Sequence, residues 1–164
     1  MSKSKYFSIL DSLTETNSKP AEPNDRVLLV DGLNTFIRAW TTSPVTNDDG
    51  VHVGGISGTL LSIGYAIKNI KPTRVILCFD GKGGSQRRRK LFPEYKASRK
   101  TSVNLNRSFM GHTDKDADQQ NMKMQLGRLV EYMGQLPVSI LAVENIEADD
   151  SIAYIAKQVL PKSQ

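Results

Sequence analysis

The sequence has little cysteine and histidine and no long apolar run. Its single cysteine, Cys78, excludes an internal disulfide and gives no sign of a secreted, disulfide-stapled protein, so we expect it to fill the core. His52 and His112 lie far apart in polar segments without metal-motif spacing, and we expect both to be solvated. No apolar stretch approaches the roughly 18 to 20 residues of a membrane span, and no signal-peptide core follows residues 1–5. These absences predict a soluble, cytoplasmic protein with no membrane partner.

The basic residues are concentrated in one stretch of the chain. The 164 residues, 38% hydrophobic and 24% charged, fit a single domain, and the net charge is +5. Between Lys82 and Lys100 there are eight basic residues and one acid, Glu94, so this stretch carries +7 and leaves −2 for the remainder. Such a local excess indicates nucleic-acid binding, although a solvated helix face or a localisation signal has the same composition. The basic residues are Lys82, Arg87, Arg88, Arg89, Lys90, Lys96, Arg99 and Lys100.

Apolar runs and apolar periodicity alternate along the chain. Continuous apolar runs predict three buried strands, at residues 27–30, 74–79 and 138–143. Helical spacing of apolar residues predicts helices within residues 33–40, 56–67, 122–133 and 152–159. This alternation favours an α/β fold with a mostly parallel central sheet and helices on both faces, because crossovers between parallel strands are right-handed.

The segments between these elements are polar. We expect residues 1–25 to form a flexible arm ahead of a domain over residues 26–164. Residues 41–55 are expected to be a loop. Gly81, Gly83 and Gly84 are expected to loosen the backbone after the second strand. Beyond them, residues 82–118 are expected to be a basic, partly mobile region, since residues 101–118 show no sustained periodicity.

Each predicted strand is followed by acidic residues. Asp31 and Asp80 come directly after the first two strands, and the third leads to Glu147, Asp149 and Asp150. Because parallel strands gather their carboxyl ends at one edge of a sheet, we expect these five acids to converge. Helix capping explains an acid such as Asp149 or Asp150 but does not explain Asp31 or Asp80, and converged carboxylates oppose folding without a cation. Oxygen ligands without a histidine or cysteine cluster favour Mg²⁺ or Mn²⁺.

The acids and the neighbouring basic stretch together fit phosphodiester chemistry. A divalent metal polarises a phosphate and lowers the pKa of a bound water, while lysines and arginines hold the polyanion. The glycines after Asp80 lack the G-x-x-x-x-G-K-[ST] spacing of a phosphate loop, so binding of a nucleoside triphosphate is not expected. The sequence therefore predicts a metal-dependent enzyme of nucleic-acid hydrolysis.

Four pieces of the sequence resemble the 5′-nuclease (flap endonuclease) superfamily. They are LVDG at residues 29–32, ILCFD at 76–80, PEYKASR at 93–99 and EADD at 147–150. Their order and spacing are similar to those of phage 5′-3′ exonucleases, phage RNase H and the nuclease domains of bacterial DNA polymerases. The resemblance implies a three-layer PIN-like (resolvase-like) domain, and a 5′-3′ exonuclease or flap endonuclease that hydrolyses DNA or RNA–DNA in replication or repair.

The resemblance also implies roles for individual residues. Five acids would hold Mg²⁺ or Mn²⁺, two ions in the complete site: Asp31, Asp80, Glu147, Asp149 and Asp150, the last acting through water. Lys96 and Arg99 would meet the scissile phosphate and, with Asp31 and Asp80, form the catalytic set. Arg87 to Lys90 would begin a helical arch around a 5′ single strand. Tyr95 would stack a base or pack under the arch. The nucleic-acid-binding set would be Lys82, Arg87, Arg88, Arg89, Lys90, Tyr95, Lys96, Arg99 and Lys100.

The resemblance covers only the amino-terminal half of the family pattern. Family members continue past the EADD helix into a strand with an S-x-D-x-D acid pair and a helix-hairpin-helix region that grips duplex DNA. We therefore expect an incomplete domain, whose partners are a second polypeptide supplying the carboxy-terminal half and branched, flapped or 5′-ended DNA or an RNA–DNA hybrid. If the gene is phage-encoded, the site of action is the bacterial host cytoplasm. Two alternatives stay open: a PIN-type ribonuclease, and a non-catalytic DNA-binding half.

Overall fold

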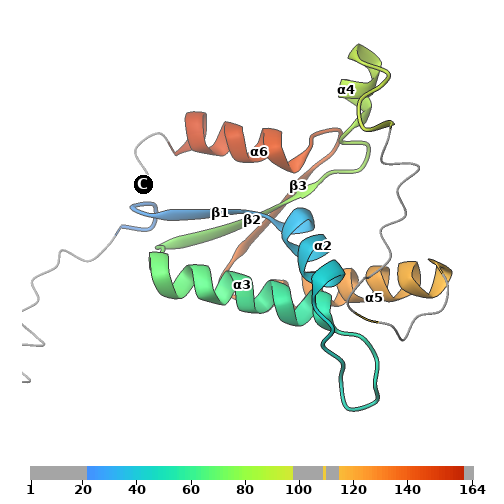
Figure 1. Cartoon of the computed structure of the whole chain (residues 1–164). Helices are drawn as coiled ribbons and strands as arrows, with labels where there is room; N and C mark the ends of the chain where they lie inside the picture. The colour runs from blue at the N-terminus through green and yellow to red at the C-terminus, as the bar shows by residue number, and fades with distance from the viewer. Residues whose placement is uncertain (1–21, 98–108, 110–114, 161–164) are drawn as a thin grey trace, which may run out of the picture.

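Three parallel strands form the centre of the protein (Figure 1). The structure, a computed structural model, describes residues 22–97, 109 and 115–160. The strands β1 (Val27–Asp31), β2 (Arg74–Asp80) and β3 (Ser139–Val143) are hydrogen-bonded in that order. The helices are α2 (Gly32–Thr42), α3 (Gly54–Ile70), α4 (Gln86–Leu91), α5 (Lys115–Gly134) and α6 (Ala148–Tyr154), and α6 continues as a π-helical turn, η2 (Ile155–Val159). The α/β fold class predicted from the sequence is confirmed.

The two faces of the sheet follow from the alternation of side chains along each strand. In β2, Val75 and Leu77 point to one face, where they join a core with side chains of α2, α3 and α5. Ile76 and Cys78 belong to the opposite face, which α6 and η2 cover. Figure 1 shows α6 on one side of the sheet and α3 and α5 on the other. Cys78 is fully buried, so its predicted place in the core is confirmed.

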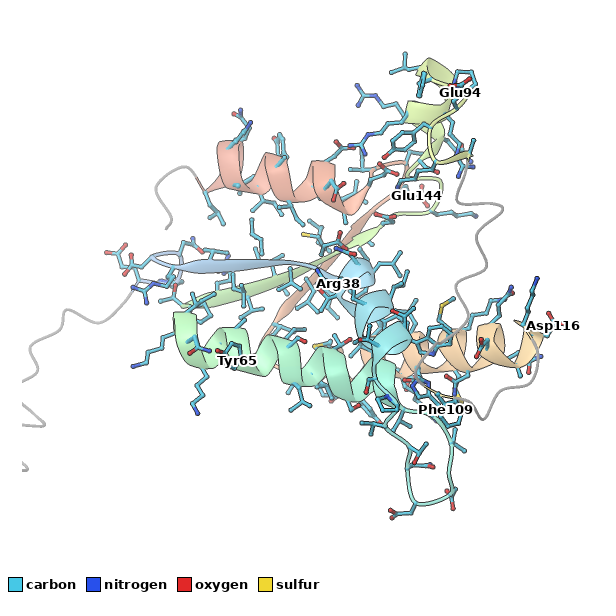
Figure 2. The ribbon with its side chains drawn as sticks, viewed as in Figure 1. Arg38, Tyr65, Glu94, Phe109, Asp116 and Glu144 are labelled. Atoms are coloured by element: carbon cyan, nitrogen blue, oxygen red, sulfur yellow. The ribbon has the colours of Figure 1, made fainter. Side chains whose placement is uncertain are left out.

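His52 is buried, and the expectation that it is solvated was wrong. Its Nε2 lies 2.7 Å from the carbonyl oxygen of Ser43, and its ring stacks on that of Phe109, which Figure 2 labels, with the centroids 5.0 Å apart. Gln125 of α5 donates to the carbonyl oxygen of His52 and accepts a hydrogen bond from the amide of Ile56. These hydrogen bonds join the polar loop between α2 and α3 to α5. They also supply the partners that buried polar groups require. His112 lies outside the described residues.

Several element boundaries differ from the expectations. The helix α5 begins at Lys115, inside the segment for which no periodicity was expected, because its first two turns are polar apart from Ala117. Residues 86–91 of the basic stretch form α4. The expected arm, residues 1–21, and most of the expected mobile region, residues 98–108 and 110–114, lie outside the described residues. None of the helices that the structure describes is long and apolar enough to cross a membrane.

Candidate active site

The acids after β1 and β2 lie on the face of the sheet that α6 covers. Asp31 is registered with Cys78, and Asp80 follows Cys78 by two residues, so all three share one face. Cys78 packs against α6 and η2, and the negative charge of Asp31 is near enough to add to the effect of burial in raising the pKa of the Cys78 thiol. The sheet therefore places both aspartates on the face that α6 covers, and Asp80 reaches the amino-terminal end of α6.

Asp31 and Asp80 each receive a helix amide on one oxygen. Asp31 is the residue before α2, and its Oδ1 accepts from the amide of Asn34 at 2.9 Å. Asp80 reaches from β2 to α6, where its Oδ1 accepts from the amide of Ala148 at 2.8 Å. The expectation that capping does not explain these two acids was wrong, because both satisfy amides at helix amino-termini. The second oxygen of each has no hydrogen-bond partner among the residues that the structure describes.

The loops after β2 and β3 are joined by backbone hydrogen bonds. The amide of Gly81 donates to the carbonyl oxygen of Ile146, and the amide of Asn145 donates to that of Lys82. Gly81 packs so closely that a Cβ atom on it would lie 1.7 Å from the carbonyl oxygen of Val143. The sequence suggested that the glycines loosen this backbone. Instead, they allow the two loops to pack together. This packing brings the basic segment after β2 next to the acids after β3.

Glu147 is the centre of the resulting charge cluster. Its side chain is only 2% exposed, although it is a carboxylate. Lys96 Nζ donates to its Oε1 at 2.5 Å, and the Tyr95 hydroxyl donates to its Oε2 at 2.9 Å. Arg88 of α4 donates to the same Oε2. Both oxygens of Glu147 are therefore occupied by side chains of the basic stretch.

Arg88 joins α4 to α6 through two acids. Besides Glu147, it donates to Asp150 Oδ1 at 2.5 Å and to the Tyr95 hydroxyl at 2.8 Å. The guanidinium carbon lies 5.5 Å from the centroid of the Tyr95 ring, and Lys96 Nζ lies 5.2 Å from it, so two cations flank one aromatic ring. Lys96 adopts a left-handed backbone conformation with φ of 57°, which is uncommon outside glycine. The side chain of this residue is held by its ion pair with Glu147.

The cluster keeps Glu147 ionised. Burial alone would raise the pKa of Glu147, but hydrogen bonds from Lys96 and Tyr95 and the charges of Lys96 and Arg88 outweigh it and lower the pKa below its ordinary value. The pKa of Arg88 is raised, chiefly by its hydrogen bond to Tyr95 and by the carboxylates of Asp150 and Glu147. The carboxylates and cations thus stabilise each other's charged forms.

The five acids offer the donor chemistry of a hard-cation site. All five are carboxylates after the three strands, and Asp149 lies exposed on the first turn of α6, where Glu147 rather than Asp149 is the helix N-cap. Within residues 22–97, 109 and 115–160 no three histidine, cysteine or acidic side chains are grouped closely enough to hold a metal ion, so the expected convergence of all five acids is not seen there. The oxygen donors fit Mg²⁺ or Mn²⁺ in kind. In this arrangement Glu147 is directed to cations of the protein itself.

The remaining residues of the predicted site are placed as follows. Arg87, Arg89 and Lys90 are exposed on α4, and Lys82 is exposed on the loop before it. Arg99 and Lys100 lie outside the described residues. Sequence reasoning assigned the cluster's cations and Tyr95 to nucleic acid and missed their contacts with Glu147. The available signal was that a basic segment and an acidic segment follow adjacent parallel strands.

Comparison with known proteins identifies a shared domain. The family described as "5'-3' exonuclease, N-terminal resolvase-like domain" matches residues 26–164. A 5′-3′ exonuclease of Bacillus subtilis is 37% identical over 81 residues, which are 46% of this chain and 27% of that protein. The DNA polymerase I of B. subtilis is 29% identical over 134 residues, which are 80% of this chain and 13% of the polymerase. The chain thus spans less than half the length of these relatives.

Solved structures share the fold. A bacteriophage T5 protein co-crystallised with metal ions superposes with a TM-score of 0.59 at 23% identity, covering 82% of this chain and 43% of that one. A T5 flap endonuclease in a complex with DNA and metal ions superposes with a TM-score of 0.58 at 24% identity, covering 82% of this chain and 44% of the endonuclease. These likenesses show the resolvase-like, PIN-like fold.

Proposed function

The chain belongs to the family of 5′-3′ exonuclease N-terminal, resolvase-like domains. We therefore propose that it forms part of a divalent-metal-dependent 5′ nuclease. The reaction is hydrolysis of phosphodiester bonds in flapped, branched or 5′-ended DNA, or in RNA–DNA hybrids, during replication or repair. The observation that carries this proposal is the pairing of Glu147 and Asp150, which follow β3, with Lys96 and Arg88 of the basic segment after β2, beside the α6 amide that donates to Asp80. Phosphoryl chemistry requires both: acids for metal ions and cations for the polyanion.

The proposed metals are Mg²⁺ or Mn²⁺, with two ions in the complete site. The residues that would hold them are Asp31, Asp80, Glu147, Asp149 and Asp150. Bound metal would polarise the phosphate and supply an activated water. The protein's own part is positioning. Helix amides hold one oxygen of Asp31 and of Asp80 by hydrogen bonds, and this fixes the position of the other oxygen of each carboxylate.

The cations of the basic stretch are proposed to bind the substrate backbone. Lys96 and Arg99 would meet the scissile phosphate, and the exposed side chains of α4 would hold the adjoining strand. Tyr95 would offer a stacking surface to a base when it is not hydrogen-bonded to Glu147. The exposed members of this set in the structure are Lys82, Arg87, Arg89 and Lys90.

A second polypeptide segment is proposed to complete the sheet. Within the described residues β3 pairs only with β2, and Ile140 and Val143 of β3 are 37% and 41% exposed. The structural relatives are more than twice as long as the part that matches this chain. A strand from the carboxy-terminal half of the family fold, supplied by a second polypeptide, would pair with β3 and cover these apolar side chains.

The test is cleavage of a 5′-flapped DNA by the assembly of this chain with its carboxy-terminal complement. In Mg²⁺, Asp80→Asn should lower the rate about 100-fold or more, because a lost metal ligand removes several kcal/mol of transition-state stabilisation. Asp116→Asn is the control, since Asp116 is exposed at the far end of α5 (Figure 2).

Four results would contradict the proposal. One is wild-type turnover by Asp80→Asn, and another is cleavage that persists in a chelator. Preferential cleavage of single-stranded RNA would favour the PIN-type ribonuclease. Tight binding of flapped DNA with no cleavage by the completed assembly would favour the non-catalytic DNA-binding half.

A further inference from the structure

The two cations on Glu147 supply the two positive charges that a divalent metal would otherwise supply. Glu147 and Asp150 carry two negative charges, and Arg88 and Lys96 carry two positive charges at hydrogen-bond distance. Both oxygens of the buried Glu147 carboxylate accept from these groups and from Tyr95. Two of these three donors are positively charged, so a divalent metal that takes Glu147 as a ligand must compete with Arg88 and Lys96 for the same carboxylate.

The segment that carries these cations, residues 86–97, buries little apolar surface in the part of the chain that the structure describes. α4 contains no buried residue, and the apolar side chains that follow it face solvent, with Leu91 81% and Phe92 56% exposed. Arg88 and Tyr95 donate to Glu147, Arg88 also donates to Asp150, and Lys96 donates to Glu147. Without apolar burial, the docking of this segment depends on that cluster.

We propose that Glu147 works as a latch: in the metal-free protein it holds residues 86–97 against α6, and a divalent metal that takes Glu147 as a ligand releases them. This inference rests on the metal site of the proposed function. After release, Arg88, Lys96 and Tyr95 no longer donate to Glu147 and instead bind a nucleic-acid strand. Metal binding and readiness of the basic segment for substrate are thereby coupled, and the coupling is reciprocal.

The latch is tested first without metal, by hydrogen exchange of the full chain in a chelator. The amides of Phe92, Tyr95 and Ala97 are hydrogen-bonded within the segment and report its order. Arg88→Gln should speed exchange across residues 86–97 about fivefold or more relative to Arg89→Gln, since opening follows the population of the released state. Arg89→Gln removes the same charge from an exposed position one residue away. Equal exchange in the two variants would overturn the latch.

The second arm adds Mn²⁺ and measures its binding by calorimetry. In the wild-type chain, saturating Mn²⁺ should raise exchange of residues 86–97. Arg88→Gln should bind Mn²⁺ roughly threefold to tenfold more tightly than Arg89→Gln, because a closed state that competes with the ligand weakens apparent affinity by its population. Tyr95→Phe, which keeps every charge, should shift binding in the same direction relative to Tyr65→Phe, whose ring is 72% exposed on α3.

The outcomes separate the latch from the proposed function. Mn²⁺ binding that leaves exchange of residues 86–97 unchanged overturns the latch and leaves the metal site standing. Absence of Mn²⁺ binding by the wild-type chain and by Arg88→Gln overturns the latch, whereas the proposed function is overturned by the cleavage assay of the completed assembly. Faster exchange with Mn²⁺, together with tighter binding by Arg88→Gln and Tyr95→Phe, supports the latch.

Discussion

Glu147 is a buried carboxylate that depends on its neighbours for its charge. Three side chains of residues 88–96 donate to it, and their combined effect keeps its pKa below the ordinary value of 4.5 in spite of burial. A carboxyl whose pKa is lower in the folded than in the unfolded state stabilises the fold fully above the unfolded value. That stabilisation is lost as the pH falls through the lower, folded value.

We therefore predict that the cost of Glu147→Gln depends on pH. Near neutral pH the variant should lose about 1 to 3 kcal/mol of unfolding free energy, because two cations lose a buried partner. The difference from wild type should shrink as the pH falls below 4.5, where the wild-type carboxyl becomes protonated. Urea denaturation over a pH series measures it. Glu131→Gln, in an exposed pair with Arg128, should stay within about 0.5 kcal/mol of wild type throughout. A pH-independent cost for Glu147→Gln would contradict the argument.

At the scale of elements, the site depends on how closely the loops after β2 and β3 approach. Backbone hydrogen bonds join Gly81 to Ile146 and Asn145 to Lys82, and these bonds place α4 beside the start of α6. The approach is possible because Gly81 has no side chain: its Cβ position is occupied by the carbonyl oxygen of Val143. The acids and cations therefore meet only if these two loops pack.

We predict opposite effects for two glycine-to-alanine substitutions. Gly81→Ala should lower the free energy of unfolding by at least about 2 kcal/mol, since a methyl group cannot fit against the backbone. Gly127→Ala, on the exposed surface of α5 with no atom within 4 Å of its Cβ position, should raise it by about 0.5 to 1 kcal/mol. Chemical denaturation of both variants decides the matter. A neutral Gly81→Ala would mean that the two loops separate easily.

At the scale of the whole molecule, positive charge is gathered on one corner. The stretch from Lys82 to Lys100 carries +7, while the remainder of the chain carries −2. In the described part of this stretch, Arg88 and Lys96 are paired with acids, whereas the other cations of α4 are exposed. Figure 1 shows α4 at the edge of the molecule, above the carboxyl ends of the strands. Electrostatic attraction of a nucleic acid is thereby directed to the candidate site.

This asymmetry predicts how nucleic-acid affinity depends on salt. Substituting glutamine for Arg87, Arg89 and Lys90 together should weaken the slope of log affinity against log salt by up to about 2.7, that is about 0.9 for each lost phosphate contact to duplex DNA. Fluorescence anisotropy over a salt series measures the slope. The control substitutes glutamine for three exposed lysines on other elements, Lys68, Lys123 and Lys157, and should leave the slope nearly unchanged. Equal changes in the two triple variants would show that only net charge matters.

Much of the fold could be predicted because it depends on local patterns. The apolar runs identified all three strands, and their period of two assigns Val75 and Leu77 to one face and Ile76 and Cys78 to the other. The position of acids directly after parallel strands predicted that they share an edge. The burial of His52 could not be predicted in this way, because its partners Asn121 and Gln125 are 69 and 73 residues away in the chain.

The amino-acid sequence by itself determined the strands, the helices on both faces and the edge of the sheet at which Asp31 and Asp80 lie, because hydrophobic periodicity and strand direction act within a few residues. Only the tertiary structure decided which charges meet. Glu147 pairs with Lys96 and Arg88 across 51 and 59 residues, and Asp80 receives an amide of α6 across 68. Such pairings depend on the approach of two loops in space, since opposite charges attract any partner within reach, and the fold determines which partners are within reach.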